Sequence, residues 1–415
     1  MDKNNSLVPL SSNTLIKVKN SIAITNKLLT DNSSIIQSRM SKTFSNIEGT
    51  IVQAIPVDKN HILLVTYGFD YDDINGYNYN CPVCEIILFD YYTGKIIRKT
   101  SFNLDYFQEY LFSLGSDIGY GPITLNYSRV QNIIVFSIIN YIRENEFDQE
   151  VPYNCSVYSL NFSTFEILAE KVIQFPIFSA VIDKKNNYIW FNCDEKTIVA
   201  NIVDLSIVTS FDYKITKKWD QWELRYFNDI KSWGIFVAMD SDLHSLLCIN
   251  DKSNYPIYTI KKIHIEHDSI IKTSEFSLTE YKSIQKYDYS EHKKQLAFID
   301  VDSKNIEIYD LTTNEIIQTI EFEDLQFYVE NQEHCYDVAY SVDGKFLLLY
   351  FEGKVFIYET NKYTMIKNFL VIDFEQVAEE SISNYSPFEL IVKFSYNSKN
   401  IITIKPEKYL RVWEF

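Results

Sequence analysis

The sequence has no surplus of positive charge. Among its 415 residues, 39 are Lys or Arg and 56 are Asp or Glu, which gives a formal net charge of −17. A field of that sign repels phosphate backbones and anionic lipid headgroups. We therefore expect neither nucleic acid nor a membrane surface as a partner.

Long apolar segments are also lacking. No run approaches the roughly 18 apolar residues that cross a bilayer as a helix, and the candidate from Ile133 to Ile139 has only the length of a strand. The first residues, MDKNNSLVPLSSNT, contain no apolar stretch of signal-peptide length. These observations predict a cytoplasmic protein.

Glycine and cysteine are scarce, with 10 and 6 residues in the whole chain. The sequence has neither a Gly-rich phosphate loop nor a Gly-x-Ser-x-Gly motif, so we expect no catalytic residues and no bound cofactor. The six cysteines are scattered through a chain long enough to bury a core without disulfides, which favours reduced thiols.

Aromatic residues are abundant, with 31 Tyr and 28 Phe among short runs of Ile, Val and Thr. This composition is typical of strands. One unit, an apolar run followed by a polar turn and a second apolar run, recurs seven times and begins at Glu85, Ser156, Ile198, Leu246, Ile306, Val355 and Tyr409. A further pair of apolar runs precedes each copy, so each unit is predicted to contain four strands.

Several short motifs in the last third of the chain resemble those of one repeat family. They are His334, the turn Ser-Val-Asp-Gly-Lys from Ser341, and the pairs Tyr309-Asp310 and Trp413-Glu414. These residues resemble the Gly-His, Ser-Pro-Asp-Gly-Lys and Trp-Asp motifs of WD-repeat β-propellers, although only Trp413 keeps the tryptophan. The resemblance implies an all-β, seven-bladed β-propeller of four-stranded antiparallel blades, which forms a single domain over residues 51–415.

Residues 1–50 are expected to complete this ring. The last repeat ends at Phe415 without an outer strand, and an open ring would leave unpaired edges. The resemblance implies that the alternating run from Thr14 to Asn20 supplies the missing strand. The spacing of Ile24, Leu28 and Ile35 predicts a short helix between that strand and the first blade.

Three groups of polar residues resemble metal or catalytic sites incompletely. Cys81 and Cys84 have the spacing of half a zinc site, but no second pair follows, and we interpret them as a cysteine pair in a loop. Asp70, Asp72 and Asp73 precede Asn75-Gly76, which favours a hairpin tip over a calcium loop. His264, His267 and His334 are interpreted as ordinary loop or capping histidines. We therefore predict no metal site.

The segment from Lys217 to Phe227 is the candidate contact surface, since it combines the residue types that dominate interface hot spots. Its candidate partner-binding residues are Trp219, Trp222, Arg225 and Tyr226. Trp222 has an alternative interpretation, in which it begins an inner strand and packs between blades.

Two functions are compatible with these features. The first is a non-enzymatic platform, expected to be monomeric, that binds a protein or peptide partner. The alternative is a propeller enzyme, a hydrolase or lyase, with acidic or histidine residues gathered at the central channel. Carboxylates or histidines at matching positions of several innermost strands would favour the enzyme.

Overall fold

A computed structural model describes residues 40–72, 76–103, 123–143, 150–175, 177–183, 188–193, 196–212, 235–239, 244–250, 257–266, 269–277, 284–300, 305–321, 336–351, 353–371, 390–405 and 409–415. All regular secondary structure in these ranges is β-strand, so the predicted all-β class is confirmed. The helix predicted between Asn20 and Met40 lies outside the described residues. No helix that could span a bilayer occurs in the described ranges.

The described strands form seven four-stranded antiparallel sheets, which we call blades. Blade one contains β2 (Thr50–Pro56), β3 (His61–Asp72), β4 (Gly76–Asp90) and β5 (Lys95–Asn103). Blade two contains β6 (Ile123–Ser128), β7 (Ile133–Arg143), β8 (Glu150–Asn161) and β9 (Ile167–Ile173). Blade three contains β10 (Ile177–Asp183), β11 (Tyr188–Cys193), β12 (Lys196–Asn201) and β13 (Ile207–Asp212).

The remaining blades follow the same order along the chain. Blade four contains β14 (Ile235–Met239), β15 (His244–Asn250), β16 (Ile257–Glu266) and β17 (Ser269–Ser277). Blade five contains β18 (Ile284–Ser290), β19 (Gln295–Asp300), β20 (Asn305–Asp310) and β21 (Glu315–Glu321). Blade six contains β22 (Tyr336–Tyr340), β23 (Phe346–Phe351), β24 (Lys354–Glu359) and β25 (Thr364–Leu370). Blade seven contains β26 (Ile391–Phe394), β27 (Asn400–Lys405), β28 (Tyr409–Glu414) and β1 (Met40–Phe44).

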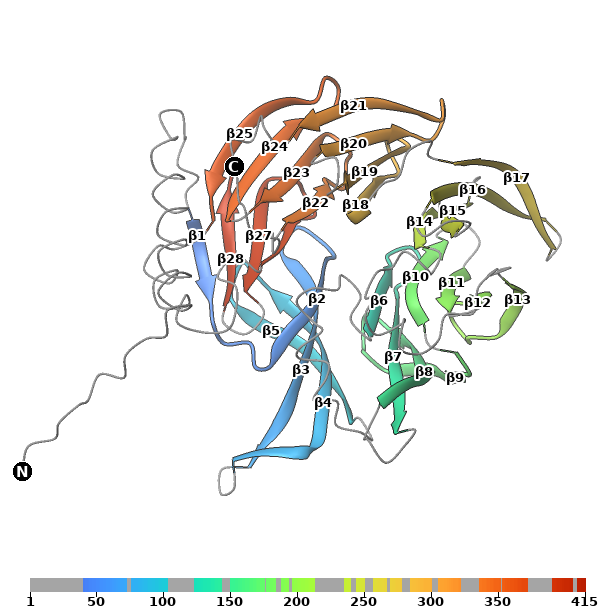
Figure 1. Cartoon of the computed structure of the whole chain (residues 1–415). Helices are drawn as coiled ribbons and strands as arrows, with labels where there is room; N and C mark the ends of the chain where they lie inside the picture. The colour runs from blue at the N-terminus through green and yellow to red at the C-terminus, as the bar shows by residue number, and fades with distance from the viewer. Residues whose placement is uncertain are drawn as a thin grey trace, which may run out of the picture.

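The blades are arranged around a common centre, as Figure 1 shows. The first strand of each blade is the innermost, and each innermost strand contacts the next one in chain order, from β2 through β6, β10, β14, β18 and β22 to β26. Contacts between β26 and β2 close the ring. The fold is therefore a β-propeller.

The apolar core lies between adjacent blades. One cluster joins blades one and two, another joins blades six and seven, and a third joins blades seven and one. The middle strands are covered on both faces, so they consist of nearly continuous apolar residues, as in FLLLYF of β23. The outer strands are largely exposed or half-buried, as in β21 and β25, each of which has a single buried residue.

Blade four differs from the sequence prediction. The copy beginning at Leu246 was expected to be a third and a fourth strand, but Leu246 lies in the second strand, β15, and Ile257 begins the third strand, β16. His264 lies in β16 opposite Ile271, so its interpretation as a loop or capping histidine was wrong. The error arose because two apolar runs joined by a polar segment have the same sequence pattern whether they form the second and third strands of a blade or the third and fourth.

The outer strand of blade seven comes from the N-terminal part of the chain, but the predicted segment was wrong. β1 (Met40–Phe44) pairs antiparallel with β28, whereas Thr14–Asn20 lies outside the described residues. The physical reason is Phe44, which packs edge-on against Phe89 of blade one with ring centroids 5.4 Å apart. The segment from Thr14 to Asn20 has no aromatic residue with which to make such a contact.

β1 is fastened to blade one at the turn after β4. The side chain of Asn46 donates to the carbonyl of Gly94 at 3.2 Å, and Lys42 donates to the carbonyl of Tyr92 while its Nζ lies 3.9 Å from the centroid of that ring. Gly94 has a φ of 75°, and a Cβ there would lie 2.5 Å from Cε1 of Phe44. Only glycine allows this approach.

The turn between the third and fourth strands is built alike in four blades. A backbone N–H donates to the carbonyl four residues earlier, and the donor has a positive φ: Gly94 to Asp90, Phe165 to Asn161, Leu205 to Asn201, and Asn314 to Asp310. Only one donor is glycine. Phe165 and Leu205 are 6% and 1% exposed, so burial worth about 1.5–3 kcal/mol offsets a left-handed conformation that costs about 1–2 kcal/mol.

We predict that Gly94→Ala destabilises the junction between blades seven and one by about 1–3 kcal/mol, because the new methyl group must displace the Phe44 ring. Urea unfolding measures the change. The control is Asn314→Ala, which also changes a turn residue of positive φ (65°). The cost of Gly94→Ala should shrink in a Phe44→Ala background, and strictly additive costs would contradict the contact.

The shared turn yields a second prediction. Leu205→Gly should lower the free energy of unfolding by at least about 2 kcal/mol, because it empties a buried position. Asn314→Gly, at the corresponding but exposed position, should be neutral or stabilising by up to about 1 kcal/mol, since it relieves the left-handed conformation. If Leu205→Gly and Asn314→Gly change the free energy of unfolding equally, burial of the side chain does not compensate for the left-handed conformation in these turns.

Candidate binding surface

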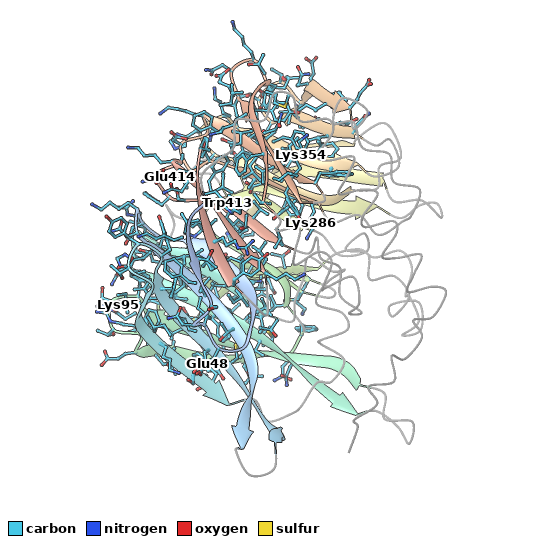
Figure 2. All side chains as sticks on the ribbon, turned by 90° about the vertical axis from the view of Figure 1, so that its left-hand side faces the viewer. Glu48, Lys95, Lys286, Lys354, Trp413 and Glu414 are labelled. Carbon is cyan, nitrogen blue, oxygen red and sulfur yellow. The ribbon has the colours of Figure 1, made fainter. Side chains whose placement is uncertain are left out.

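The turns between first and second strands and those between third and fourth strands lie at the same end of the ring, because the strands alternate in direction. We call this end the turn face. In Figure 2 the turn face lies toward the left, where Lys95 and Glu414 mark the turn-face ends of their strands. Lys286 and Lys354, near the opposite ends of their strands, lie further right. The turns after the innermost strands, here called inner turns, surround the centre of the ring, and those after the third strands, the outer turns, lie further out.

A buried serine shapes four of the inner turns. Each serine hydroxyl accepts a hydrogen bond from a backbone N–H later in the turn: Ser128 from Gln131 (3.2 Å), Ser290 from Lys293 (3.3 Å), Ser341 from Phe346 (2.9 Å) and Ser395 from Asn400 (2.9 Å). All four serines are at most 3% exposed. Such satisfied, buried groups hold the exposed residues of each turn in a defined position.

Arg129 and Tyr396 form a contact across two inner turns. The guanidinium of Arg129 in blade two lies 4.8 Å from the ring centroid of Tyr396 in blade seven and donates a hydrogen bond to its hydroxyl. These blades are separated by blade one, so the contact spans the inner edge of that blade. Val130, next to Arg129, is 72% exposed. Arg129 and Val130 are exposed and Tyr396 is half-buried, and Arg, Tyr and aliphatic side chains held in place are suited to contact a partner.

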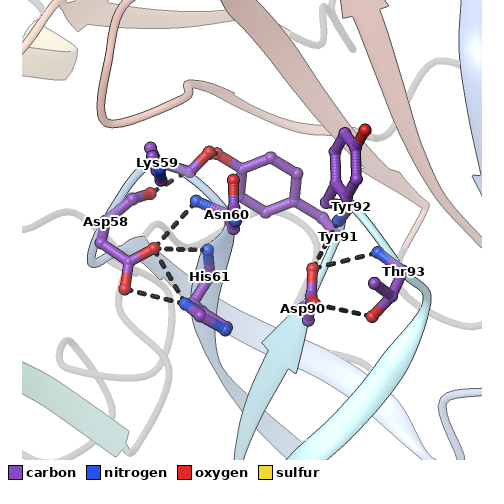
Figure 3. A network of polar contacts seen from close by, with 8 residues as sticks. All are labelled: Asp58, Lys59, Asn60, His61, Asp90, Tyr91, Tyr92 and Thr93. Carbon is purple, nitrogen blue, oxygen red and sulfur yellow. Dashed lines mark hydrogen bonds and ion pairs between the residues drawn. The ribbon is translucent and has the colours of Figure 1, made fainter.

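The inner and outer turns of blade one are joined by a polar network, drawn in Figure 3. Asp58 accepts hydrogen bonds from the N–H groups of Asn60 (2.8 Å) and His61 (2.9 Å), and its carboxylate contacts Nδ1 of His61 at 2.8 Å. The hydroxyl of Tyr91 donates to the carbonyl of Lys59. Partial burial favours a higher pKa for Asp58, but the hydrogen bonds from Asn60 and His61 outweigh it and lower the pKa. Asp58 therefore remains an anion that fixes this turn.

Charged residues also gather at the centre of the ring, on three consecutive innermost strands. Asp288 of β18 accepts a hydrogen bond from the N–H of Tyr340 in β22 at 2.6 Å. Lys393 of β26 lies 3.6 Å from the carboxylate of Asp337 in β22, with side chains 35% and 17% exposed. Burial raises the pKa of Asp288 to about 6, although the charge of Lys393 and the Tyr340 hydrogen bond oppose the shift. The attraction of Asp337 raises the pKa of Lys393.

This central cluster connects blades five, six and seven through side chains. Gln53 has a similar role between blades one and two, because its amide donates to the carbonyl of Ile123 (2.6 Å) and accepts from the N–H of Leu125 (2.9 Å). Asp288 and Lys393 each stand two residues before the serine of their inner turn. These matching positions of two innermost strands therefore carry opposite charges. The enzyme alternative would instead be favoured by carboxylates or histidines at matching positions.

The four residues proposed from the sequence as a contact surface, Trp219, Trp222, Arg225 and Tyr226, lie outside the described residues. They fall between β13 and β14, and the innermost strand of blade four begins at Ile235. The prediction that they bind a partner remains a proposal.

Cys81 and Cys84 both lie within β4, so the interpretation as a loop pair was wrong. Cys84 is fully buried in the cluster between blades one and two, and burial strongly raises the pKa of its thiol. A buried neutral thiol behaves as a core residue rather than a reactive or metal-binding one. No group of three or more His, Cys, Asp or Glu side chains able to hold a metal ion occurs among the residues that the structure describes.

The acidic segment beginning at Asp70 has the predicted hairpin form. β3 and β4 pair as far as Asp72 opposite Gly76, and residues 73–75 at the tip lie outside the described ranges. His267 and His334 also fall outside those ranges, so their predicted roles are untested.

The contact between Arg129 and Tyr396 and the central cluster were missed by sequence reasoning. A signal existed for part of the surface, because Ser-Tyr-Asn-Ser-Lys from Ser395 repeats the pattern of Ser-Val-Asp-Gly-Lys from Ser341. In both turns the serine hydroxyl donates to the side chain two residues later, Asp343 or Asn397, at 2.8 Å. The repeated turn would have placed Tyr396 on the turn face.

Comparisons with known proteins identify the fold. No family model matches the sequence, and no curated protein matches it. The structure is similar to the crystal structure of the β-propeller domain of Cps50 (Swd1) from Myceliophteria thermophila, with a TM-score of 0.55 and 10% sequence identity over 91% of this chain and 99% of that one. In blade seven of the present chain, the Trp413 indole donates to the buried Thr403 hydroxyl at 2.9 Å. The chain therefore has the fold of a divergent WD-repeat-like β-propeller.

Proposed function

We propose that this chain is a non-enzymatic platform that binds a protein partner on its turn face. The observation that carries the proposal is the arrangement of Arg129, Val130 and Tyr396 on inner turns that buried serines fix. An interface gains affinity when its anchor residues are ordered before binding, because less conformational entropy is lost. The WD-repeat-like fold supports a role in protein interaction in general terms.

The titratable groups at the centre of the ring are the observation that would favour the enzyme alternative. Their hydrogen bonds and ion pair favour a structural role instead. Asp288 is engaged by the Tyr340 N–H of the next blade, and Asp337 is paired with Lys393. Groups that hold neighbouring blades together in this way are already satisfied, so we interpret the cluster as a connection between blades.

The platform proposal predicts that contact residues on the turn face control partner capture. The immobilised chain is exposed to native lysate, captured proteins are identified by mass spectrometry, and each is quantified for variants. Val130→Ser and Tyr396→Ala should reduce capture of a specific partner about tenfold or more, as expected for anchor residues. Ile317→Ser, which changes a 42% exposed residue on the outer strand β21, is the matched control.

The same assay tests the segment proposed from the sequence. If Trp219→Ala and Arg225→Ala abolish capture while the turn-face variants do not, the interface lies in that segment and the turn-face proposal is wrong. Capture unchanged in all four variants, with thermal midpoints intact, would contradict both surfaces.

The structural interpretation of the central cluster predicts a pH dependence of stability. The pKa of Asp288 is about 6 in the folded chain, above the usual 3.8, so the folded state holds this proton more tightly than the unfolded state. Asp288 therefore contributes to stability at low pH, and this contribution is lost as the pH rises from about 4 through 6. Since a difference of one in pKa corresponds to about 1.4 kcal/mol, Asp288→Asn should raise the free energy of unfolding at pH 8 by up to about 3 kcal/mol and change it little at pH 4.

Urea unfolding of both proteins across this pH range measures the difference. The variant keeps an oxygen that can accept from the Tyr340 N–H, so the connection between blades is retained. A difference that does not vary with pH would show that the Asp288 carboxyl is not the titrating group.

A further inference from the structure

On the turn face, side chains of opposite charge lie at different distances from the centre of the ring. The five inner turns of blades one, two, five, six and seven carry six cationic side chains, Lys59, Arg129, Lys293, Lys294, Lys345 and Lys399. They carry three acidic ones, Asp58, Glu291 and Asp343. This excess of positive charge stands out in a chain whose net charge is −17.

Two of the three inner carboxylates are engaged by their own turns. Asp58 accepts from the N–H groups of Asn60 and His61, as described above. Asp343 accepts from the N–H of Lys345 at 3.2 Å and from the hydroxyl of Ser341 at 2.8 Å. Its ion pair with Lys345, at 3.0 Å, has side chains 39% and 71% exposed, so the pair contributes little and can be exchanged for another carboxylate.

The outer turns have the opposite charge. In blades one, two, three, five and six they carry six acidic side chains, namely Asp90, Glu166, Asp204, Asp310, Glu315 and Glu359. Their cationic side chains are Lys95 and Lys362. Among the turns that the structure describes, the inner ones thus carry net positive charge and the outer ones carry net negative charge. At physiological salt, charges are screened beyond about 8 Å, so a partner responds to the turns that it lies against.

This arrangement of charge favours a narrow polyanion as a partner over one that covers the whole turn face. A flat anionic membrane or a nucleic acid duplex would cover the acidic outer turns together with the inner ones and be repelled there. A single extended polypeptide can lie over the inner turns without covering the outer ones. Arg129 adds specificity, since its planar guanidinium is oriented by Tyr396 and retains N–H donors for a carboxylate.

We propose that the inner turns bind an acidic polypeptide segment, in which Asp or Glu residues contact the ring of Lys and Arg and an apolar residue packs on Val130 and Tyr396. This inference rests on the proposed platform function and names its partner class. A net charge of −17 by itself disfavours an acidic partner, but this average conceals the positive charge of the described inner turns.

The test uses the full chain and a fluorescently labelled peptide in which glutamate alternates with leucine, followed by fluorescence anisotropy. A peptide with glutamine in place of glutamate is the control for charge. The glutamate peptide should bind at least about tenfold more tightly, and raising the salt concentration should weaken its binding. Equal binding of the two peptides would overturn the proposal.

Matched variants locate the site. Arg129→Gln with Lys399→Gln should weaken binding of the glutamate peptide about tenfold or more. Lys95→Gln with Lys362→Gln removes the same charge from the outer turns and should change binding less than about twofold. Equal losses in the two double variants would show a nonspecific charge effect and overturn the site. Thermal midpoints of all variants establish that the fold is intact.

Two further probes separate other polyanions from the proposed one. Tighter binding of a DNA duplex or of phosphatidylserine vesicles than of the glutamate peptide would overturn the proposal in favour of that polyanion. If the peptide does not bind but capture from lysate still depends on Val130 and Tyr396, the platform function holds and only the acidic partner class is wrong.

Discussion

The blades whose side chains the structure describes bury their apolar residues against neighbouring blades. The apolar clusters lie between sheets rather than within one, so a blade that lost a neighbour would expose a complete face. The ring must therefore close, and the contact that closes it allows the apolar faces between the other blades to be buried as well. That contact joins the first described strand to the last, where β1 pairs with β28 and Phe44 packs on Phe89.

The need for closure explains the one glycine in the shared outer turns. Gly94 stands where the Phe44 ring approaches the backbone too closely for a Cβ. The corresponding positions elsewhere hold Phe165 and Leu205, which adopt the same left-handed conformation and fill the core. A glycine-poor chain thus forms tight turns because burial of a large side chain compensates for the strained backbone.

The same turn construction orders the surface that we propose as a binding site. Buried serines and capping carboxylates satisfy the polar groups of each inner turn, so the exposed residues between them have few alternative conformations. The acidic net charge and the positive inner turns are compatible because the carboxylates are concentrated elsewhere, including the outer turns.

The sequence by itself determined the class of fold, because aromatic and β-branched runs separated by polar turns are compatible only with strands, and their repetition requires a ring. It also indicated the turn at Ser341, whose local hydrogen bonds depend on residues close in sequence. The strands formed by the fourth repeat copy were mispredicted, since two apolar runs joined by a polar segment do not show which strands of a blade they form. Only the tertiary structure identified β1, the contact between Arg129 and Tyr396, and the cluster of Asp288, Asp337 and Lys393. β1 and the contact between Arg129 and Tyr396 join distant parts of the chain through closure of the ring, and the cluster joins consecutive repeats through the packing of neighbouring blades. No local sequence pattern encodes either kind of proximity.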